Sequence, residues 1–205
     1  MNPESLKLET RLNGEEENNT KSKSDAVDLR LLEARTILVE GPVTDRMYRS
    51  VCSRLLYLEH KDANQEILVV VNSPGGSADT GFGIYDLMRF ISCPVKTLTA
   101  GISASAAVLI SLGGEKGRRF MLPHARYLLH QPSMATGIAS ASDMEITARE
   151  ILRTRQKYAE IVALEVGSSP DKIQQDTNRD FWLDAEECLK YGLVDKIVKE
   201  RKEIQ

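Results

Sequence analysis

Residues 67–76 read Ile-Leu-Val-Val-Val-Asn-Ser-Pro-Gly-Gly. The apolar run at the start is continuous and mostly β-branched, which is typical of a strand covered on both faces, and Asn-Ser-Pro-Gly-Gly ends it. A helix is expected next, because apolar residues from Ile84 to Ile91 repeat at the spacing of one buried helix face. This stretch predicts a buried strand, a tight turn and a helix that returns along the sheet.

The same alternation of strand and helix continues on both sides of this stretch. Further strands are expected over residues 36–39, 95–100, 127–130 and 193–198. Helices are expected after Thr44, over 105–112, from a capping box at Ser142 and Glu145 to Gly167, from Ser169-Pro170, and from a capping box at Asp184 and Glu187 to Gly192. Met144, Ala148, Ile151 and Val162 are expected to form the apolar stripe of the long helix. Strands that alternate with crossover helices predict an α/β protein with a mostly parallel sheet.

Length and composition predict one globular domain. The chain has 205 residues, of which 41% are apolar and 28% are charged. We expect a mobile polar arm over residues 1–29, a single domain over 30–199 and a charged tail over 200–205. No apolar run approaches the roughly 20 residues that a bilayer span needs, and no secretory signal is visible, so a cytoplasmic protein is expected.

Charge and cysteine content exclude several classes of partner. A net charge of −3 and a pI near 5.7 leave no basic stripe for phosphates, so nucleic acid is not an expected partner. Cys52, Cys93 and Cys188 lie in or beside apolar segments and lack the spacing of a metal site. Buried reduced thiols and no metal site are therefore expected.

One histidine and one serine stand out as candidates for chemistry. His60 and His124 lie in polar connections, whereas His130 ends an apolar strand and should emerge at a sheet edge. Ser105 begins a helix of small and apolar residues, where free N–H groups stabilise negative charge. An ordinary helix cap at Ser105 and a structural role for His130 are the alternatives.

The partners of such a pair are less clear from spacing. Gly75 and Gly76 allow the backbone to approach a ligand and to aim an amide at an oxyanion, although a simple turn is the alternative. Residues 101–105 come close to a nucleophile elbow centred on Ser103, but the order of acid and histidine does not fit. Asp180 is the favoured acid; the acids that spacing leaves open are Asp171, Asp176 and Asp184.

Several motifs in a fixed order carry a family resemblance. They are residues 71–76 (Val-Asn-Ser-Pro-Gly-Gly), 84–88 (Ile-Tyr-Asp-Leu-Met), 101–105 (Gly-Ile-Ser-Ala-Ser), 130–132 (His-Gln-Pro), 148–152 (Ala-Arg-Glu-Ile-Leu), 176–180 (Asp-Thr-Asn-Arg-Asp) and 191–195 (Tyr-Gly-Leu-Val-Asp). From about residue 37 to residue 198 the chain resembles the proteolytic subunit of Clp protease. The resemblance implies a fold similar to that of crotonases, built of stacked ββα units with a long handle helix.

The resemblance also implies a site and an assembly. Ser105 would be the nucleophile, His130 the base and Asp180 the acid of a serine peptidase, and the amides of Gly76 and Ala106 would form the oxyanion hole. The chains would form two heptameric rings, a tetradecamer that encloses the active sites and cleaves unfolded proteins. An AAA+ unfoldase would dock on the ring and use the ATP, so the chain itself would need no cofactor.

The sequence departs from the family pattern at three places. Ala106-Ala107 follows the nucleophile where Met and Gly are usual, Ser133-Met134-Ala135 stands where a Gly-Gly pair is typical, and Leu68 and Val70 replace common docking tyrosines. These changes resemble a divergent second paralogue. A weakly active ring subunit that needs a second Clp paralogue is the alternative function, and an acyl-CoA hydratase or isomerase on the related fold is a third.

Overall fold

The computed structural model describes residues 26–133 and 140–204. The chain divides into two units, residues 1–36 and residues 37–205, which are described separately. In the first unit residues 26–33 are helical, so the boundary expected at residue 29 falls inside a helix. The rest of the predicted arm, residues 1–25, lies outside the described residues.

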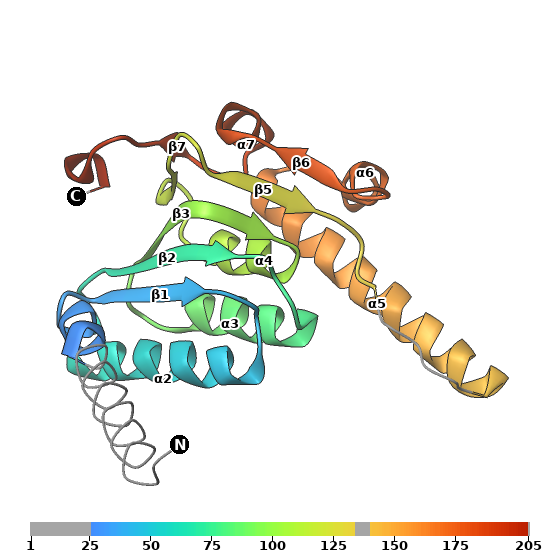
Figure 1. The fold of residues 1–205 in the computed structure, drawn as a ribbon, viewed down its shortest axis with the longest axis horizontal. Helices are drawn as coiled ribbons and strands as arrows, with labels where there is room; N and C mark the ends of the chain where they lie inside the picture. Colours follow the sequence, from blue (N-terminus) through green and yellow to red (C-terminus); the bar gives the residue numbers. More distant parts are fainter. Residues whose placement is uncertain (1–25, 134–139, 205) are drawn as a thin grey trace, which may run out of the picture. The chain divides into compact units, whose positions relative to one another are not determined.

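The second unit is built on a mixed sheet (Figure 1). Its strands are β1 (Thr36–Glu40), β2 (Ile67–Ser73), β3 (Val95–Ala104), β4 (Arg119–Met121), β5 (Arg126–Leu129), β6 (Phe181–Leu183) and β7 (Lys196–Ile197). In the described part of the chain the order is β1-β2-β3-β4-β7, while β5 pairs with both β3 and β6. β2, β4 and β5 run parallel to β3, and β7 runs parallel to β4; β6 is antiparallel to β5. The predicted, mostly parallel α/β sheet is confirmed.

β3 is the central strand because it has two successive neighbours on the same edge. Its first half, Thr97–Thr99, pairs with β4, and its second half, Ile102–Ala104, pairs with β5. On the other edge β2 follows β3 as far as the pair of Ser73 and Ser103. The carboxyl ends of β2, β3 and β5 therefore meet at one edge of the sheet, where α/β proteins place their ligands.

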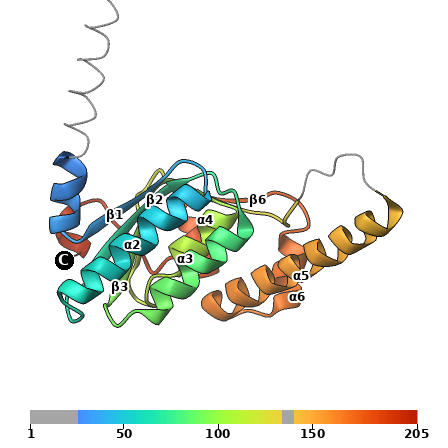
Figure 2. The same cartoon turned by 90° about the horizontal axis from the view of Figure 1, so that it is seen from below.

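Helices pack against this sheet within the same unit. They are α2 (Asp45–Lys61), α3 (Ala78–Phe90), α4 (Ala106–Leu112), α5 (Ala141–Val166), α6 (Pro170–Asp176) and α7 (Ala185–Tyr191), followed by a 3₁₀ helix, Arg201–Ile204. Figure 2 shows α2 and α3 side by side, and α3 also contacts α4. None of the helices in the described ranges combines the length and the apolarity needed to cross a membrane.

Several helix ends follow the predicted capping residues. Thr44 accepts a hydrogen bond from the Met47 amide at 3.3 Å, and Asp184 forms a capping box with Glu187. Gly167 and Gly192 close α5 and α7 in the left-handed conformation that favours glycine. The N-cap of α5 differs from the prediction: Ser140, not Ser142, accepts from the Asp143 amide at 3.2 Å.

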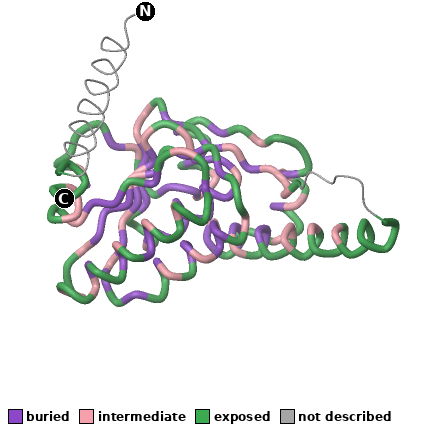
Figure 3. The backbone as a smooth tube through the Cα atoms, turned by 60° about the horizontal axis from the view of Figure 1, so that its bottom comes forward, coloured by how far each residue is buried: buried purple, intermediate pink, exposed green. Residues whose placement is uncertain are grey.

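The predicted apolar stripe of α5 is wrong over the first half of the helix. Met144 and Ala148 are exposed and Ile151 is half-buried, whereas Val162, in the second half, is fully buried. Figure 3 shows the same change along α5, from exposed turns to buried ones. The physical reason is length, because within the described residues it is the second half of this 26-residue helix, from Tyr158 onward, that is buried against the rest of the unit.

All three cysteines are buried and free, and burial raises the pKa of the Cys188 thiol to about 12, so it stays protonated at neutral pH.

The predicted tail over 200–205 is described as far as residue 204. Ile204 is buried in a cluster with Leu68 and Phe120, so this segment packs on the domain.

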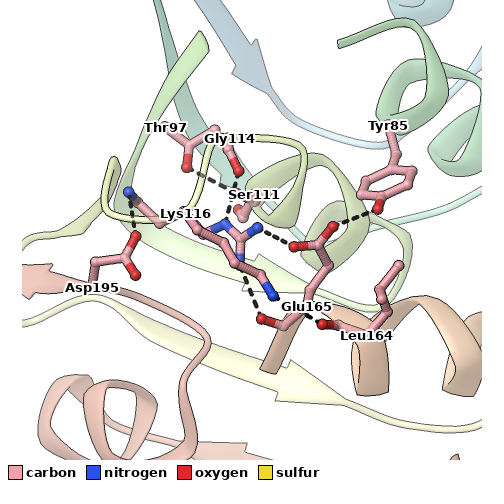
Figure 4. Close-up of polar contacts among 9 residues, drawn as sticks. Tyr85, Thr97, Ser111, Gly114, Lys116, Leu164, Glu165 and Asp195 are labelled. Atoms are coloured by element: carbon pink, nitrogen blue, oxygen red, sulfur yellow. Dashed lines mark hydrogen bonds and ion pairs between the residues drawn. The ribbon is translucent and has the colours of Figure 1, made fainter. Parts of the chain in front are cut away.

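A buried ion pair ties the end of α5 to the sheet (Figure 4). Arg119 of β4 and Glu165 of α5 are both fully buried and bonded to each other. Glu165 also accepts a hydrogen bond from the Tyr85 hydroxyl at 2.6 Å, and the Arg119 Nε donates to the Gly114 carbonyl at 2.8 Å. Burial and this bond to Glu165 raise the pKa of Tyr85 above its usual value, so the phenol remains a donor.

We predict that Glu165→Ala destabilises the domain strongly. The substitution leaves the Arg119 cation buried without its carboxylate, which costs about 3–5 kcal/mol in comparable cases. Chemical denaturation of the variant and of the wild type measures this difference in the free energy of unfolding. Glu160→Ala is the matched control on the exposed side of the same helix, and an equal loss in the two variants would contradict the role assigned to the buried pair.

Candidate active site

Ser105 occupies a strained junction between strand and helix. It follows β3 directly and is the N-cap of α4, with φ 55° and ψ −123°. Its amide donates to the Leu128 carbonyl at 2.8 Å, which fixes the backbone, but its side chain makes no capping hydrogen bond. Positive φ at a non-glycine residue costs free energy and is concentrated at functional sites. The ordinary helix cap considered as the alternative for Ser105 is therefore not what the structure contains.

The turn after β2 lies directly against Ser105. A Cβ atom added to Gly75 would lie 2.6 Å from the Ser105 Cβ and 2.4 Å from the Ala104 carbonyl oxygen. Gly75 also has φ +86°, a conformation that side chains rarely adopt. The Ser73 hydroxyl holds this turn, because it donates to the Gly41 carbonyl at 2.6 Å and accepts from the Gly75 amide. The glycine is needed here for close approach.

Two backbone amides beside Ser105 are available to a ligand. Among the described residues the Gly76 N–H has no acceptor, because the bridge to Val43 uses the Gly75 carbonyl and the Ser77 amide. Ala106 supplies the first amide of α4, and the first amides of a helix have no acceptor within it. These are the two donors expected for an oxyanion hole.

His130 lies at the same edge of the sheet as Ser105. It follows β5, whose residue Leu128 pairs with Ala104 of β3 in parallel register, so both strands end together. Ser105 and His130 line one cavity of about 550 Å³, together with the Gly75-Gly76 turn. His130 is half-buried, whereas His60 and His124 are exposed. The structure thus brings together the predicted nucleophile, base and glycine turn.

The antiparallel pair β5 and β6 carries His130 towards Asp180. Leu129 pairs with Phe181, so His130 and Asp180 are the next residues along the two strands, facing each other. Both residues line a second cavity of about 590 Å³, which shares His130 and Ser133 with the first. Asp180 is exposed in the single chain.

Two of the acids that spacing left open are occupied elsewhere. Asp184 caps α7 through the Glu187 amide at 2.9 Å. Asp176 accepts from Lys172 and from the Tyr191 hydroxyl. Asp171 is exposed in the first turn of α6 and does not line the cavity that Asp180 shares with His130. Asp180 is the candidate acid that faces the histidine.

The side chains of Ser105, His130 and Asp180 are near one another but are not connected. Among the described residues, no hydrogen bond joins Ser105 to His130 or His130 to Asp180. Hydrogen bonds between catalytic groups are often long in a free enzyme and shorten when substrate binds. The backbone arrangement is therefore present, and the final alignment of side chains is not.

Ser103, the other serine of the elbow-like sequence, points into the core. It is fully buried, and its hydroxyl bonds to the Ser111 hydroxyl at 2.8 Å. Thr99 and Tyr127 continue this buried network, with 2.8 Å between their hydroxyl oxygens. A substrate has no access to Ser103.

Sequence reasoning missed part of the cavity wall. Asp79 of α3 and the α5 residues Ile151 and Thr154 also line the cavity beside Ser105. These residues are distant from Ser105 in sequence, so the sequence does not indicate that they lie beside it. Ile151 was the one among them that the apolar period of α5 predicted to face the rest of the protein. Met134 and Ala135, where the sequence departs from the family pattern, lie outside the described residues.

Comparisons with known proteins agree with this geometry. The profile of the Clp protease family matches residues 18–201. An ATP-dependent Clp protease proteolytic subunit from Streptococcus mutans is 44% identical over 171 residues, covering 83% of this chain and 87% of that protein. The corresponding subunit from Streptococcus sanguinis is 43% identical over the same shares. A mutant of ClpP1 from Listeria monocytogenes superposes with a TM-score of 0.80 and 36% identity, covering 87% of this chain and 99% of that one. The chain therefore belongs to the Clp protease family.

Proposed function

We propose that this chain is the proteolytic subunit of an ATP-dependent Clp protease and that it hydrolyses peptide bonds through Ser105, His130 and Asp180. The observation that carries the proposal is the placement of Ser105. It stands at a strained strand-to-helix junction, without a capping bond, in a cavity that also contains His130. The names of the similar streptococcal proteins support the same function.

The proposed chemistry is acyl transfer through a serine nucleophile. The Ser105 Oγ attacks the peptide carbonyl while His130 accepts its proton, and His130 then donates that proton to the leaving amine. The amides of Gly76 and Ala106 stabilise the negative charge that develops on the carbonyl oxygen. Water repeats the sequence and releases the acyl product from Ser105.

Asp180 is proposed to orient His130 rather than to carry a proton. A carboxylate across the strand pair from the histidine fixes the imidazole tautomer and stabilises the cation that forms during attack. The facing positions of His130 and Asp180, one step beyond the pair of Leu129 and Phe181, support this role.

We propose that the chains assemble into two heptameric rings. Large apolar side chains are exposed on the single chain, and such surface is commonly covered by a partner. Among them are residues on α2 and along the first half of α5: Tyr48, Leu56, Tyr57, Met144, Ile146 and Leu152. A tetradecamer of this kind encloses the cavities beside Ser105 and limits access to unfolded chains.

The ATP in this function is used by a separate partner. An AAA+ unfoldase that docks on a ring and feeds in unfolded proteins would hydrolyse it, so the chain needs no cofactor for peptide hydrolysis. A partner that consumes ATP requires a compartment that contains ATP, which favours the cytoplasmic location expected from the sequence.

A second candidate is a weakly active ring subunit that needs a Clp paralogue. The departure from the family pattern at Ser133-Met134-Ala135, where a Gly-Gly pair is typical, is the ground for this alternative. A neighbouring subunit with a different substrate-binding segment would then complete the alignment of the three side chains.

Fluorophosphonate labelling, combined with the mass of the intact assembly, tests the proposal. These reagents modify only an activated serine, so we expect labelling of Ser105 in a particle of fourteen chains and none in Ser105→Ala. Labelling that appears only after a Clp paralogue from the same genome is added would favour the second candidate. No labelling under either condition would contradict the proposed peptidase activity.

A further inference from the structure

Tyr191, the last residue of α7, contacts both sides of the short segment that carries Asp180. Its hydroxyl donates to the Asp176 Oδ2 at 2.7 Å, and its ring packs edge-on against Phe181 with 5.4 Å between ring centroids. Asp176 immediately precedes the segment 177–180, and Phe181 immediately follows it. One side chain therefore holds both ends of this segment.

The Asp176 contact is a charged hydrogen bond with a second partner. Lys172 donates to the same carboxylate at 2.5 Å. Burial alone raises the pKa of Asp176, but the hydrogen bonds from Lys172 and Tyr191 outweigh it and leave the pKa below its usual value. The carboxylate is thus ionised at neutral pH, and the pKa of Tyr191 is raised by burial and by this bond, so the phenol remains the donor.

The ring contact between Tyr191 and Phe181 involves a residue that belongs to the sheet. Phe181 begins β6 and pairs with Leu129 of β5, the residue before His130. Tyr191 therefore contacts a residue whose backbone is fixed by the strand that leads to the histidine. The relative placement of His130 and Asp180 depends on this end of the segment as much as on the other.

Within the segment 177–180, hydrogen bonds fix Thr177 at the start, whereas the side chains at the end of the segment are not fixed in this way. The Thr177 hydroxyl donates to the Ile173 carbonyl at 2.7 Å, and the Thr177 carbonyl accepts from the Gln131 amide at 3.2 Å. In the described ranges, the side chains of Arg179 and Asp180 make no hydrogen bond. The backbone position of Asp180 is therefore constrained by the contacts at the two ends of the segment.

We propose that Tyr191 is a positioning residue that holds the backbone of Asp180 across the strand pair from His130, so that the carboxylate can reach the imidazole. The inference rests on the proposed function, in which Asp180 orients the imidazole. Tyr191 does not line either cavity beside these residues, so its contacts with Asp176 and Phe181 are the route by which it reaches the site. A displacement of about 1 Å in a catalytic group can lower a rate by about 100-fold, so modest freedom at Asp180 has a measurable effect.

The test is Tyr191→Phe, which removes the hydroxyl and keeps the ring against Phe181. Steady-state hydrolysis of a fluorogenic peptide is measured in the assembly that cleaves it. We expect kcat to fall about 10-fold while KM is unchanged, because substrate contacts are not altered. In an Asp180→Asn background the same substitution should change kcat by less than about 2-fold, since the residue through which Tyr191 acts is already disabled.

Tyr158→Phe is the matched control. Tyr158 is a buried tyrosine of α5. It lies close enough to Tyr191 for that residue to contribute, after burial, to raising the pKa of Tyr158. The Tyr158 hydroxyl has no hydrogen-bond partner within the described residues. Removing this hydroxyl should leave kcat unchanged. If Tyr191→Phe does not fold, Asp176→Ala breaks the same hydrogen bond from the other side and carries the same expectation.

Each outcome separates this inference from the proposed function. An unchanged kcat in Tyr191→Phe, or an equal fall in the Asp180→Asn background, would overturn the positioning role and leave the peptidase intact. Peptide cleavage by the wild-type protein that persists in Ser105→Ala, or no cleavage in any assembly, would overturn the proposed function itself.

Discussion

Ser105→Ala is expected to abolish peptide hydrolysis while leaving the fold and the assembly intact. The loss should be roughly 10⁴-fold or more, because the hydroxyl is the attacking group and binding alone supplies only residual catalysis. Stability should change little, since the side chain makes no capping hydrogen bond that could be lost. Initial rates with a fluorogenic peptide, together with thermal unfolding and particle mass, measure both parts of this expectation.

Ser103→Ala is the control for this prediction. The Ser103 hydroxyl is buried and bonded to Ser111, so its removal should cost about 1 kcal/mol of stability and leave the cleavage rate nearly unchanged. If Ser103→Ala were inactive and Ser105→Ala active, the nucleophile would be misassigned.

The second large effect is expected from His130→Ala and Asp180→Asn, each of which should remove most of the acylation rate. Loss of the acid leaves the imidazole without the group that fixes its tautomer, which costs roughly 10⁴-fold in a comparable site. Members of such a set act as a unit, so a variant that carries both substitutions should fall little below either one. The rate of fluorophosphonate labelling at Ser105 reports acylation directly.

Asp184→Asn is the matched control for the acid, because asparagine caps a helix as well as aspartate does. It makes the same chemical change on the α7 N-cap, and we expect normal labelling rates. Asp176→Asn should lower the rate far less than Asp180→Asn. A variant series in which Asp180→Asn is near normal and Asp176→Asn is inactive would show that the acid lies one helix turn earlier.

The order of strands and helices could be predicted from sequence because each depends on local patterns. The apolar run before Ser73 and the capping residues Thr44 and Asp184 are signals of this kind, and the structure contains both. β4 and β6 were missed because strands of three residues are too short to show a period.

The parts of the site that sequence could not decide depend on contacts between distant segments. Spacing left four acids open, and only the pairing of β5 with β6 places Asp180 across from His130. The apolar period of α5 continues through Met144 although no residue in the described ranges covers that end, because periodicity does not say which partner buries a face. The positive φ of Ser105 likewise leaves no trace in the residue types around it.

The backbone conformation of Ser105 bears on how this protein could be engineered. A non-glycine residue at φ 55° carries roughly 1–3 kcal/mol of strain, and glycine at this position would relieve it. The same change deletes the nucleophile, so heat resistance and turnover are opposed at this position. Directed evolution that selects survivors of heating without scoring turnover would favour inactive chains here, as expected when a strained residue serves activity at the expense of stability.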